Sequence, residues 1–235
     1  MLYYFPLISV LSLSLLPGLS AANDIALQDD SSDELCMPFM QRDLYPSTVQ
    51  HMLDAASKGN LYRVEPTSST MGFCLDSAIG LIEGEFKNFR GGFTLQKEAA
   101  GTTGQVMMMV ETASLEAPGF MVENLLKGDG FFESDDYPEF IFVSTGFYWV
   151  NETEAVLIGD LTIRDVTRSV GFHVQLNVED ASITDKSQRI HISASTKIRR
   201  SEFGIISLAS IASDDVTLCM HVEAVRYSTS KSAKS

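Results

Sequence analysis

The side chains that could carry chemistry are few in this chain and lie far apart in the sequence. Its four histidines are His51, His173, His191 and His221, and none has the helical spacing of a metal site. The last three lie between residues that we expect to face a core, so their imidazoles are predicted to point outward from three consecutive strands. This placement favours solvated or hydrogen-bonded histidines over a surface metal site.

Acidic pairs and nucleophiles give no stronger signal. Asp135 and Asp136 directly precede Tyr137 and Pro138, a composition typical of a solvated turn rather than of paired catalytic carboxylates. The chain has no Gly-x-Ser-x-Gly motif and no local signature of a Ser-His-Asp arrangement. The sequence therefore predicts neither an enzyme nor a bound cofactor or metal.

Three cysteines, Cys36, Cys74 and Cys219, allow one disulfide and leave one thiol over. Cys74 and Cys219 each lie between apolar neighbours, so we expect both to point outward, from the first and the last strand. Those strands are neighbours in a closed barrel, which would let Cys74 pair with Cys219. Cys36 is the rival partner for either thiol, and the sequence leaves both pairings open.

The first 22 residues carry no charged side chain and contain an apolar and serine core, Leu11–Leu16, before Ser20-Ala21-Ala22. That pattern predicts a secretory signal peptide cleaved between Ala22 and Asn23, and hence an exported protein. An N-terminal membrane anchor is the alternative, but the apolar run is shorter than the roughly 20 residues that a span needs. The formal net charge of -14 argues against nucleic acid and anionic membrane surfaces as partners.

We divide the chain into a signal peptide at 1–22, an N-terminal extension at 23–60, one large β-domain at 61–228 and a disordered tail at 229–235. The extension begins with an acidic stretch that is predicted to be mobile. A short helix follows, in which Val49, Met52, Leu53 and Ala56 form one apolar stripe. A helix of this length is unstable alone, so it is expected to dock on the main domain.

From Leu61 onward, apolar residues recur at every second position, which predicts strands. A helix is expected over Pro118–Lys127, with Met121, Leu125 and Leu126 on one side. About eight sequential antiparallel strands predict an all-β, up-and-down barrel, because closure removes exposed sheet edges. The expected strand segments are Tyr62–Leu75, two within Ile82–Gln96 around a turn at Arg90–Gly92, Gln105–Leu115, Glu139–Val150, Glu154–Val178, Arg189–Phe203 and Asp214–Tyr227.

An eight-stranded barrel is wide enough to be filled by its own side chains or to hold one small ligand. The alternation alone leaves both interpretations open. The outer face of the Gln105–Leu115 strand is unusually apolar at Met107 and Met109, which would suit contact with a partner. The residues predicted to face inward are Phe73, Phe86, Phe89, Met108, Phe140, Phe142, Leu161, Ile163, Ile198, Leu218 and Met220.

Several motifs occur together in a fixed order. They begin with Tyr62-Arg63-Val64-Glu65-Pro66 and Gly84-Glu85-Phe86-Lys87-Asn88-Phe89-Arg90-Gly91, and continue with Phe131-Phe132-Glu133, Tyr137-Pro138 and Gly159-Asp160-Leu161-Thr162-Ile163. Over roughly residues 61 to 227, the chain resembles the YceI family, exported lipocalin-like barrels that bind polyisoprenoids or related long-chain lipids. The resemblance implies a lipocalin-like fold in a periplasmic protein.

The chain departs from the family pattern at polar positions. Arg164-Asp165 stand where the family usually has His-Gly, and Asp76-Ser77 occupy a region where the family often has a histidine. Residues 23–60 extend beyond the family core. These changes leave the barrel intact, and no polar contact that the family makes to a ligand headgroup is carried over to this chain through them.

The resemblance implies an elongated apolar cavity that sequesters a long chain, such as a polyprenyl lipid, a quinone side chain or a fatty amide. The segment Pro118–Phe132 is expected to cover one mouth of the barrel. With Leu126, Phe131 and Phe132 of that cover, and with Arg200 and Phe203, the inward-facing residues are the expected ligand contacts.

Arg200 has two open interpretations: its stem packs on an aromatic ring, or its guanidinium meets a polar headgroup. The alternatives to a carrier are a lipid-modifying enzyme and a filled-core structural or interaction barrel. A homodimer is left open, and no stable membrane anchor is expected.

Overall fold

Regular alternation of buried and exposed side chains builds the wall of the protein. In β8 (Glu154–Ile163) every second residue is buried, from Ala155 to Ile163. The second half of β9 (Val166–Leu176) alternates in the same way. Successive side chains of a strand point to opposite faces, so one face of each strand enters the core and the other faces outward.

The computed structural model describes residues 46–98, 101–176 and 189–227. The predicted signal peptide and leader, Cys36 and the C-terminal tail lie outside these residues. The described helices are α2 (Pro46–Ser57) and α3 (Phe120–Lys127), and neither is long and apolar enough to cross a membrane. In chain order the other strands are β1 (Leu61–Val64), β2 (Thr70–Ser77), β3 (Gly80–Phe86), β4 (Phe89–Glu98), β5 (Gly101–Glu111), β6 (Leu115–Glu116), β7 (Glu139–Trp149), β10 (Arg189–Arg199) and β11 (Asp215–Arg226).

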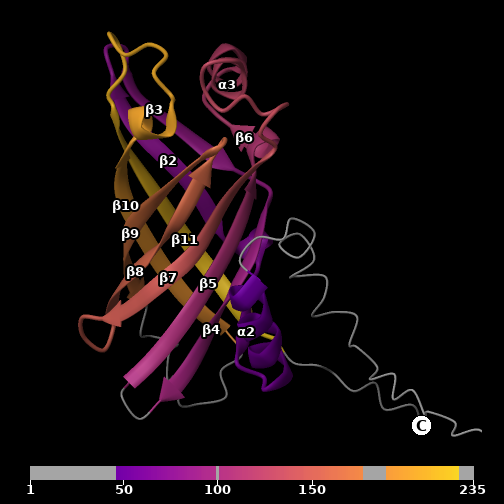
Figure 1. The fold of residues 1–235 in the computed structure, drawn as a ribbon. Helices are drawn as coiled ribbons and strands as arrows, with labels where there is room; N and C mark the ends of the chain where they lie inside the picture. The colour runs from indigo at the N-terminus through magenta and orange to yellow at the C-terminus, as the bar shows by residue number, and fades with distance from the viewer. Residues whose placement is uncertain (1–45, 99–100, 177–188, 228–235) are drawn as a thin grey trace, which may run out of the picture.

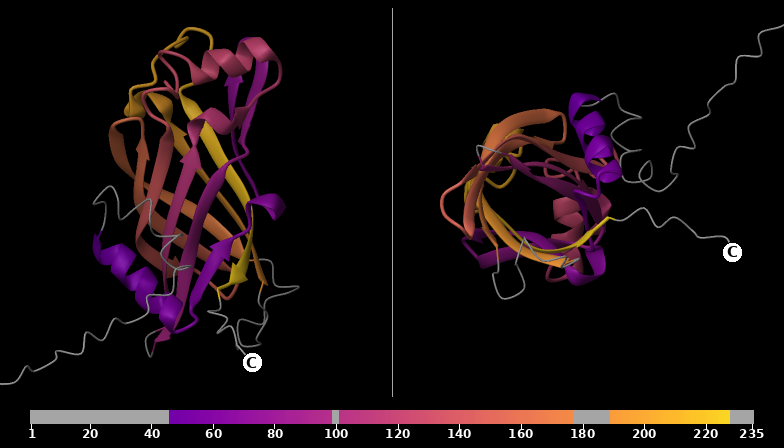
Figure 2. Two further views of the ribbon diagram at one scale, coloured as in Figure 1. Left: turned by 90° about the vertical axis from the view of Figure 1, so that its right-hand side faces the viewer. Right: turned by 90° about the horizontal axis from the view of Figure 1, so that it is seen from below.

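The strands occupy eight positions around a closed antiparallel barrel (Figure 1). β1 with β2, β3 with β4, and β5 with β6 are the broken halves of the first three positions, and the five later strands fill the others. β11 pairs with β10 on one side and with both β1 and β2 on the other, so the last strand closes on the first. The predicted eight-stranded up-and-down barrel is confirmed, and the strands form a ring when viewed end-on (Figure 2).

The first strand is interrupted, contrary to the expectation of one strand over Tyr62–Leu75. A 3-10 turn, η1 (Pro66–Ser68), separates β1 from β2. Proline has no backbone N–H and cannot donate a ladder hydrogen bond, so the strand ends there. The next two positions break beside it, at Lys87–Asn88 and at η2 (Thr112–Ser114), where Lys87 N donates to Ser114 O at 3.1 Å. The three breaks form one jointed line across the wall.

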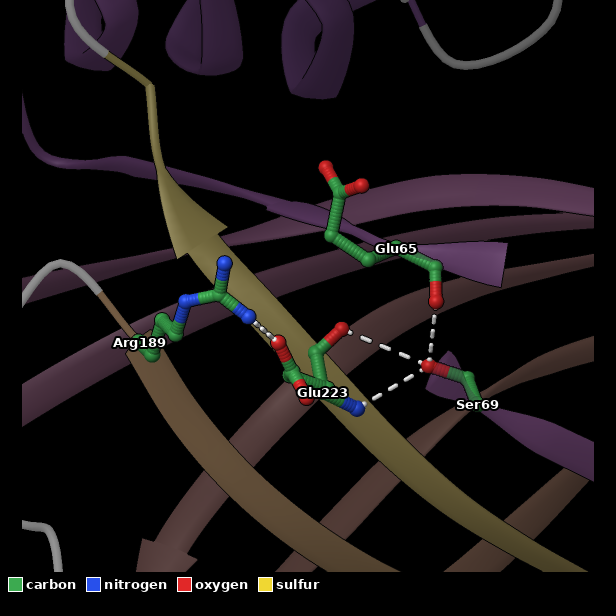
Figure 3. A network of polar contacts seen from close by, with 4 residues as sticks. All are labelled: Glu65, Ser69, Arg189 and Glu223. Carbon is green, nitrogen blue, oxygen red and sulfur yellow. Dashed lines mark hydrogen bonds and ion pairs between the residues drawn. The ribbon is translucent and has the colours of Figure 1, made fainter. Parts of the chain in front are cut away.

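Ser69 bridges the gap that the proline turn leaves (Figure 3). Its hydroxyl donates to Glu65 O at 2.8 Å and accepts from Glu223 N at 2.9 Å. Glu65 N donates to Glu223 O at 2.9 Å. The Glu223 carboxylate also forms an ion pair with Arg189 of β10. β11 therefore stays bonded to the first strand across the gap between β1 and β2.

The expected turn at Arg90–Gly92 is wrong, because these residues lie inside β4 and pair with β5. Gly91 provides space instead of a turn. A Cβ at this position would lie 2.3 Å from the Met108 sulfur and 2.4 Å from Met107 O. Gly91 therefore reflects close packing of β4 on β5, and the chain breaks earlier, at Lys87–Asn88.

The helix α2 covers the apolar outer face of β5. Met107 and Met109 are each 1% exposed. They belong to a second, smaller core outside the barrel wall that also contains Val49, Met52, Ala56, Leu61, Ile141 and Val143. The helix of this same chain therefore accounts for the apolar face, and the interpretation of Met107 and Met109 as a surface for another molecule is wrong.

α3 lies at one end of the barrel with the β2–β3 turn and the β10–β11 connection, whereas α2 lies toward the other end (Figures 1 and 2). We call the end that carries α3 the mouth. The inward side of α3 differs from the expected one. Val122 and Leu126, four residues apart on one face, pack against the core, while Met121 and Leu125 are exposed.

The two described cysteines lie on neighbouring strands but form no bridge. Cys74 is opposite Thr217 and Cys219 is opposite Gly72, so the two thiols are diagonal neighbours. Diagonal cross-strand positions are roughly 7–8 Å apart, too far for a disulfide without a shift of register. Burial raises the pKa of the Cys219 thiol above its ordinary value, and Cys74 and Glu83 add to the rise.

Thiol labelling tests whether Cys74 and Cys219 are both free, as their diagonal positions imply. We expect iodoacetamide to alkylate both Cys74 and Cys219 in protein denatured without reductant, as read by peptide mass spectrometry. In the folded protein, Cys219 should react slowly at neutral pH and faster as the pH rises, because its raised pKa leaves less thiolate. A peptide that stays unlabelled until reductant is added would contradict the free pair.

Candidate ligand-binding site

An apolar cavity of about 210 Å³ occupies the barrel interior beneath α3. Its wall draws side chains from all eight positions of the barrel, from α3, and from the loop that follows η3 (Arg200–Phe203). Nearly all are aliphatic or aromatic, and Arg200 is the one charged residue among the described residues of the wall. Such a space suits an apolar chain and disfavours a polar substrate.

The structure brings the predicted ligand contacts together, with one exception. Phe89 is buried, but its ring packs in the core beside the cavity, because the Lys87–Asn88 break displaces it from the line of Phe86. Contact with a ligand stays a prediction for every residue of the set. The predicted residues that line the cavity are Phe73, Phe86, Met108, Leu126, Phe131, Phe132, Phe140, Phe142, Leu161, Ile163, Ile198, Arg200, Phe203, Leu218 and Met220.

We call residues 117–138, which contain α3, the lid. Its Phe132 ring meets the rings of Phe73, Phe86 and Phe140, with centroid separations of 5.7, 5.8 and 5.1 Å. Phe86 and Phe140 also meet edge to face at 5.5 Å. Each such pair stabilises by about 0.5–1.5 kcal/mol beyond its buried area. These ring contacts hold the lid over the cavity.

Two glycines in the wall make room for aromatic rings. A Cβ at Gly84 would lie 2.6 Å from the Phe73 ring, and a Cβ at Gly159 would lie 2.4 Å from the Phe142 ring. Phe142 then packs edge to face on Phe172, with centroids 5.2 Å apart. Because the glycines let these rings approach the neighbouring strand, space remains in a lumen with an aromatic wall.

Sequence reasoning missed part of the wall. Leu157, Phe172 and Ala194 line the cavity from β8, β9 and β10, and they follow the same alternation as the predicted residues. The loop 205–213 also contributes. Its high content of isoleucine and leucine, unusual for a solvated connection, is the signal that could have revealed it.

Arg200 is buried in the wall, and backbone carbonyls occupy most of its guanidinium. It donates to the carbonyl oxygens of Ser213 at 2.8 Å, Ile205 at 2.9 Å, Ser207 at 2.7 Å and Ala212 at 3.2 Å. An arginine has five N–H donors, and four of them bind these carbonyl oxygens and thereby shape the 205–213 loop. This arrangement favours a structural role, and headgroup recognition stays a prediction.

The charge of Arg200 has a counter-charge nearby. Ser201 donates to the Asp214 carboxylate from its hydroxyl at 2.7 Å and from its N–H at 2.9 Å. These hydrogen bonds lower the pKa of Asp214, and the positive charges of Arg200 and Arg199 lower it further. Asp214 is therefore ionised at neutral pH and offsets the positive charge that an anionic headgroup would seek.

Arg164, in the β8–β9 turn, ties the lid to the mouth of the barrel. Its guanidinium forms an ion pair with Glu133 at 2.7 Å, lies over the Tyr137 ring at 5.4 Å and donates to Gly204 O at 3.3 Å. Glu133 also accepts from Gly130 N at 3.1 Å. Both charged side chains are mostly buried, so this pair contributes more than an exposed salt bridge does.

The histidines and acidic residues considered as candidate reactive groups lie outside the cavity wall of the described chain. His173 and His221 are exposed on the outer wall, where the His221 Nδ1 lies 3.0 Å from the Ser193 hydroxyl. Asp135 and Asp136 are exposed in a turn of the lid. Within the described part of the chain, no group of three or more His, Cys, Asp or Glu side chains is placed to hold a metal ion.

Removing Arg164 should loosen the lid and leave the barrel folded. We expect Arg164→Leu to lower the free energy of unfolding by about 1–3 kcal/mol, because Glu133 loses its partner in a partly buried site. Amide hydrogen exchange should quicken in residues 120–134 before it does in the strands. Arg168→Leu, the same change at an exposed residue of β9, is the control. Equal exchange profiles for the two variants would contradict the tie.

Relatives of this chain include bacterial proteins described as UPF0312 proteins. One from Pseudomonas putida strain W619 is 32% identical over 124 residues, which cover 53% of this chain and 64% of the relative. The chain thus spans just under two thirds of that relative. Another, from Photorhabdus laumondii, is 29% identical over 145 residues, or 62% of this chain and 74% of the relative.

Solved structures that share the barrel include two that match over most of their own length. Burkholderia cenocepacia BcnA has a TM-score of 0.60 and 22% identity, over 69% of this chain and 99% of that one. A domain from Saccharophagus degradans, described as a polyisoprenoid binding domain implicated in plant cell wall breakdown, has a TM-score of 0.53 and 14% identity, over 70% of this chain and 98% of that one. At these identities the likeness establishes the fold.

A family model described as YceI-like domain matches residues 62–224. The matched segment begins in β1, ends in β11 and includes all the described side chains of the cavity wall. It also covers well over half of the 235 residues. The chain therefore belongs to the family of proteins with a YceI-like domain.

Proposed function

We propose that this protein is a periplasmic carrier that sequesters a long-chain apolar lipid inside its barrel, with no bond made or broken. The observation that carries the proposal is the cavity, an apolar space beneath the lid with a wall drawn from every barrel position. The Saccharophagus neighbour, described as a polyisoprenoid binding domain, supports the same class of cargo. Polyprenyl lipids, quinone side chains and fatty amides share the required hydrocarbon chain.

Affinity in such a site comes mainly from hydrocarbon burial, at about 0.8 kcal/mol per methylene before ordering costs. The cavity of about 210 Å³ is smaller than the roughly 300–1,000 Å³ of sites for drug-sized ligands. A long chain therefore needs the Phe132 ring to move aside, or it leaves part of its length in the mouth. The Phe132 ring is held by contacts with other rings, so moving it leaves no buried polar group without a hydrogen-bond partner.

A lipid-modifying enzyme is the first alternative. A hydroxyl and an imidazole do meet at Ser193 and His221, but on the outer face of the wall, whereas Ala194 beside Ser193 lines the cavity. A lipid inside the barrel would not reach that pair. A filled-core structural barrel is the second alternative, and the open cavity favours a carrier over it.

Native mass spectrometry of protein purified from its own host tests the carrier function, and we expect a bound lipid mass that denaturation releases. In vitro, a fluorescent polyene fatty acid should bind saturably and be recovered unchanged. Ala194→Trp should weaken that binding by about tenfold or more, because the indole fills the cavity. Ala194→Ser, a small change at the same wall position, is the matched control.

Two results would contradict the carrier function. One is bare protein from the host together with undiminished probe binding by the Ala194→Trp variant. The other is recovery of the probe with an altered mass, which would favour the enzyme.

Hydrogen exchange tests whether the lid gates the cavity. With the polyene fatty acid bound, we expect exchange to slow more over residues 118–132 than in the strands, because the ligand restrains a segment that packs directly on it. The β7–β8 turn at the opposite end serves as the internal control. Protection that is equal in the strands and in the lid would count against gating.

A further inference from the structure

Large apolar side chains stand exposed around the mouth of the barrel. Ile79 is 82% exposed, Phe120 80% and Met121 85%. They come from the β2–β3 turn and the lid, and the loop after η3 adds more. We call this surface the rim; its members are Ile79, Leu81, Phe120, Met121, Leu125, Ile206, Leu208 and Ile211.

Most of the rim lies on segments without charged residues, and Leu125 is the member that lies between two, Glu123 and Lys127. Charged residues make up 20% of the chain, yet none occurs in residues 77–82, 117–122 or 203–213. Three separate segments of this kind at one end of the barrel form a surface that water solvates poorly.

These segments are joined in space. Ala78 N donates to Ile211 O at 2.8 Å, and Ser213 N donates to Asp76 O at 2.8 Å, so the β2–β3 turn is bonded to the loop after η3. A Cβ at Gly130 of the lid would lie 2.3 Å from a side-chain atom of the same loop. Figures 1 and 2 show all three at the mouth. The rim is therefore one surface drawn from three parts of the sequence.

The rim also continues into the cavity. Ile79, Leu125, Leu208 and Ile211 are exposed at the surface and line the cavity as well. An apolar chain can thus pass from the outside into the lumen along apolar side chains. The one cation in the described wall, Arg200, is turned toward loop carbonyls.

Other apolar patches of the fold differ from the rim. Met107 and Met109 are covered by α2. Toward the opposite end of the barrel, the large exposed apolar residues of the described chain are Tyr148 and Val150, at the β7–β8 turn that also carries Glu152. The mouth is thus where the fold concentrates its uncovered apolar surface.

We propose that the rim docks on the surface of a zwitterionic lipid bilayer, with Ile79, Phe120 and Met121 inserted at the boundary of headgroups and acyl chains. Apolar side chains presented by a short helix and turns insert about 5–10 Å at such a boundary. The net charge of -14 opposes an anionic bilayer and so selects an electrically neutral one. The purpose of docking, to take up or release a lipid, rests on the proposed carrier function, but docking itself needs no cargo.

Flotation with phosphatidylcholine vesicles tests the docking. Wild-type protein should float, and the rim variant Phe120→Ser/Met121→Ser should bind about a hundredfold more weakly, since each buried large side chain is worth roughly tenfold. The matched control, Tyr148→Ser/Val150→Ser, removes exposed apolar side chains toward the opposite end and should float as the wild type does. Added phosphatidylglycerol should weaken flotation at low salt, and added salt should restore it.

The orientation has its own measurement, because the chain has a single tryptophan, Trp149, at the end of β7 away from the mouth. Vesicles of brominated phosphatidylcholine should leave the fluorescence of Trp149 unquenched in the wild type. In a Trp149→Phe background, the Phe120→Trp variant should be quenched on binding. Quenching of Trp149 in the wild type would overturn docking through the mouth.

The outcomes separate docking from carriage. Failure of the wild type to float, or equal flotation of the rim and control variants, overturns docking. A dimer that the rim variant abolishes, seen by light scattering without flotation, assigns the rim to a second copy and also overturns it. Binding of the polyene fatty acid without vesicles should be equal in the wild type and in the Phe120→Ser/Met121→Ser rim variant, because neither residue lines the cavity. Docking can thus fail while carriage stands, and carriage can fail while docking stands.

Discussion

Closure of the sheet is the constraint on which every other part of this protein depends. An open sheet of this size would leave two edges of unpaired backbone and would expose its aromatic face to water. The last strand pairs with the first, but the first is interrupted at Pro66. The Ser69 hydroxyl and the Glu65 backbone supply hydrogen bonds to Glu223 at that point. The lumen, the lid above it and the rim exist only because the ring is complete.

The strands, their order and the family could be predicted because burial of one sheet face makes apolar residues alternate along each strand. This pattern can be read from each strand segment by itself. Errors arose where one residue type serves two purposes. Gly91 looks the same whether it turns the chain or admits the Met108 side chain. Alternation also tells which side chains point inward without telling whether their rings meet in the middle. That depends on Gly84 and Gly159, which recess Phe73 and Phe142 toward the wall.

Polar contacts were the hardest to predict, because their partners are mostly backbone. The carbonyls that Arg200 binds have no signature in the sequence, so its stem and its charge looked equally important. Arg164 departs from the family pattern, and its role depends on an ion pair with Glu133, a lid residue some thirty positions earlier in the chain. Apolar surfaces raise the same difficulty: Met109 and Met121 look alike in sequence, yet only the second is left uncovered.

The jointed line across the first three barrel positions determines which side of the barrel deforms more easily. β8 and β11 run unbroken for ten and twelve residues, whereas the first three positions are hinged at Pro66–Ser68, Lys87–Asn88 and Thr112–Ser114. Bending at a hinge strains fewer ladder hydrogen bonds than bending an intact strand does. The ring is therefore stiff on one side and compliant on the other. Its cross-section can widen on the compliant side, beneath the lid, while the number of strands and the closure of the ring stay the same.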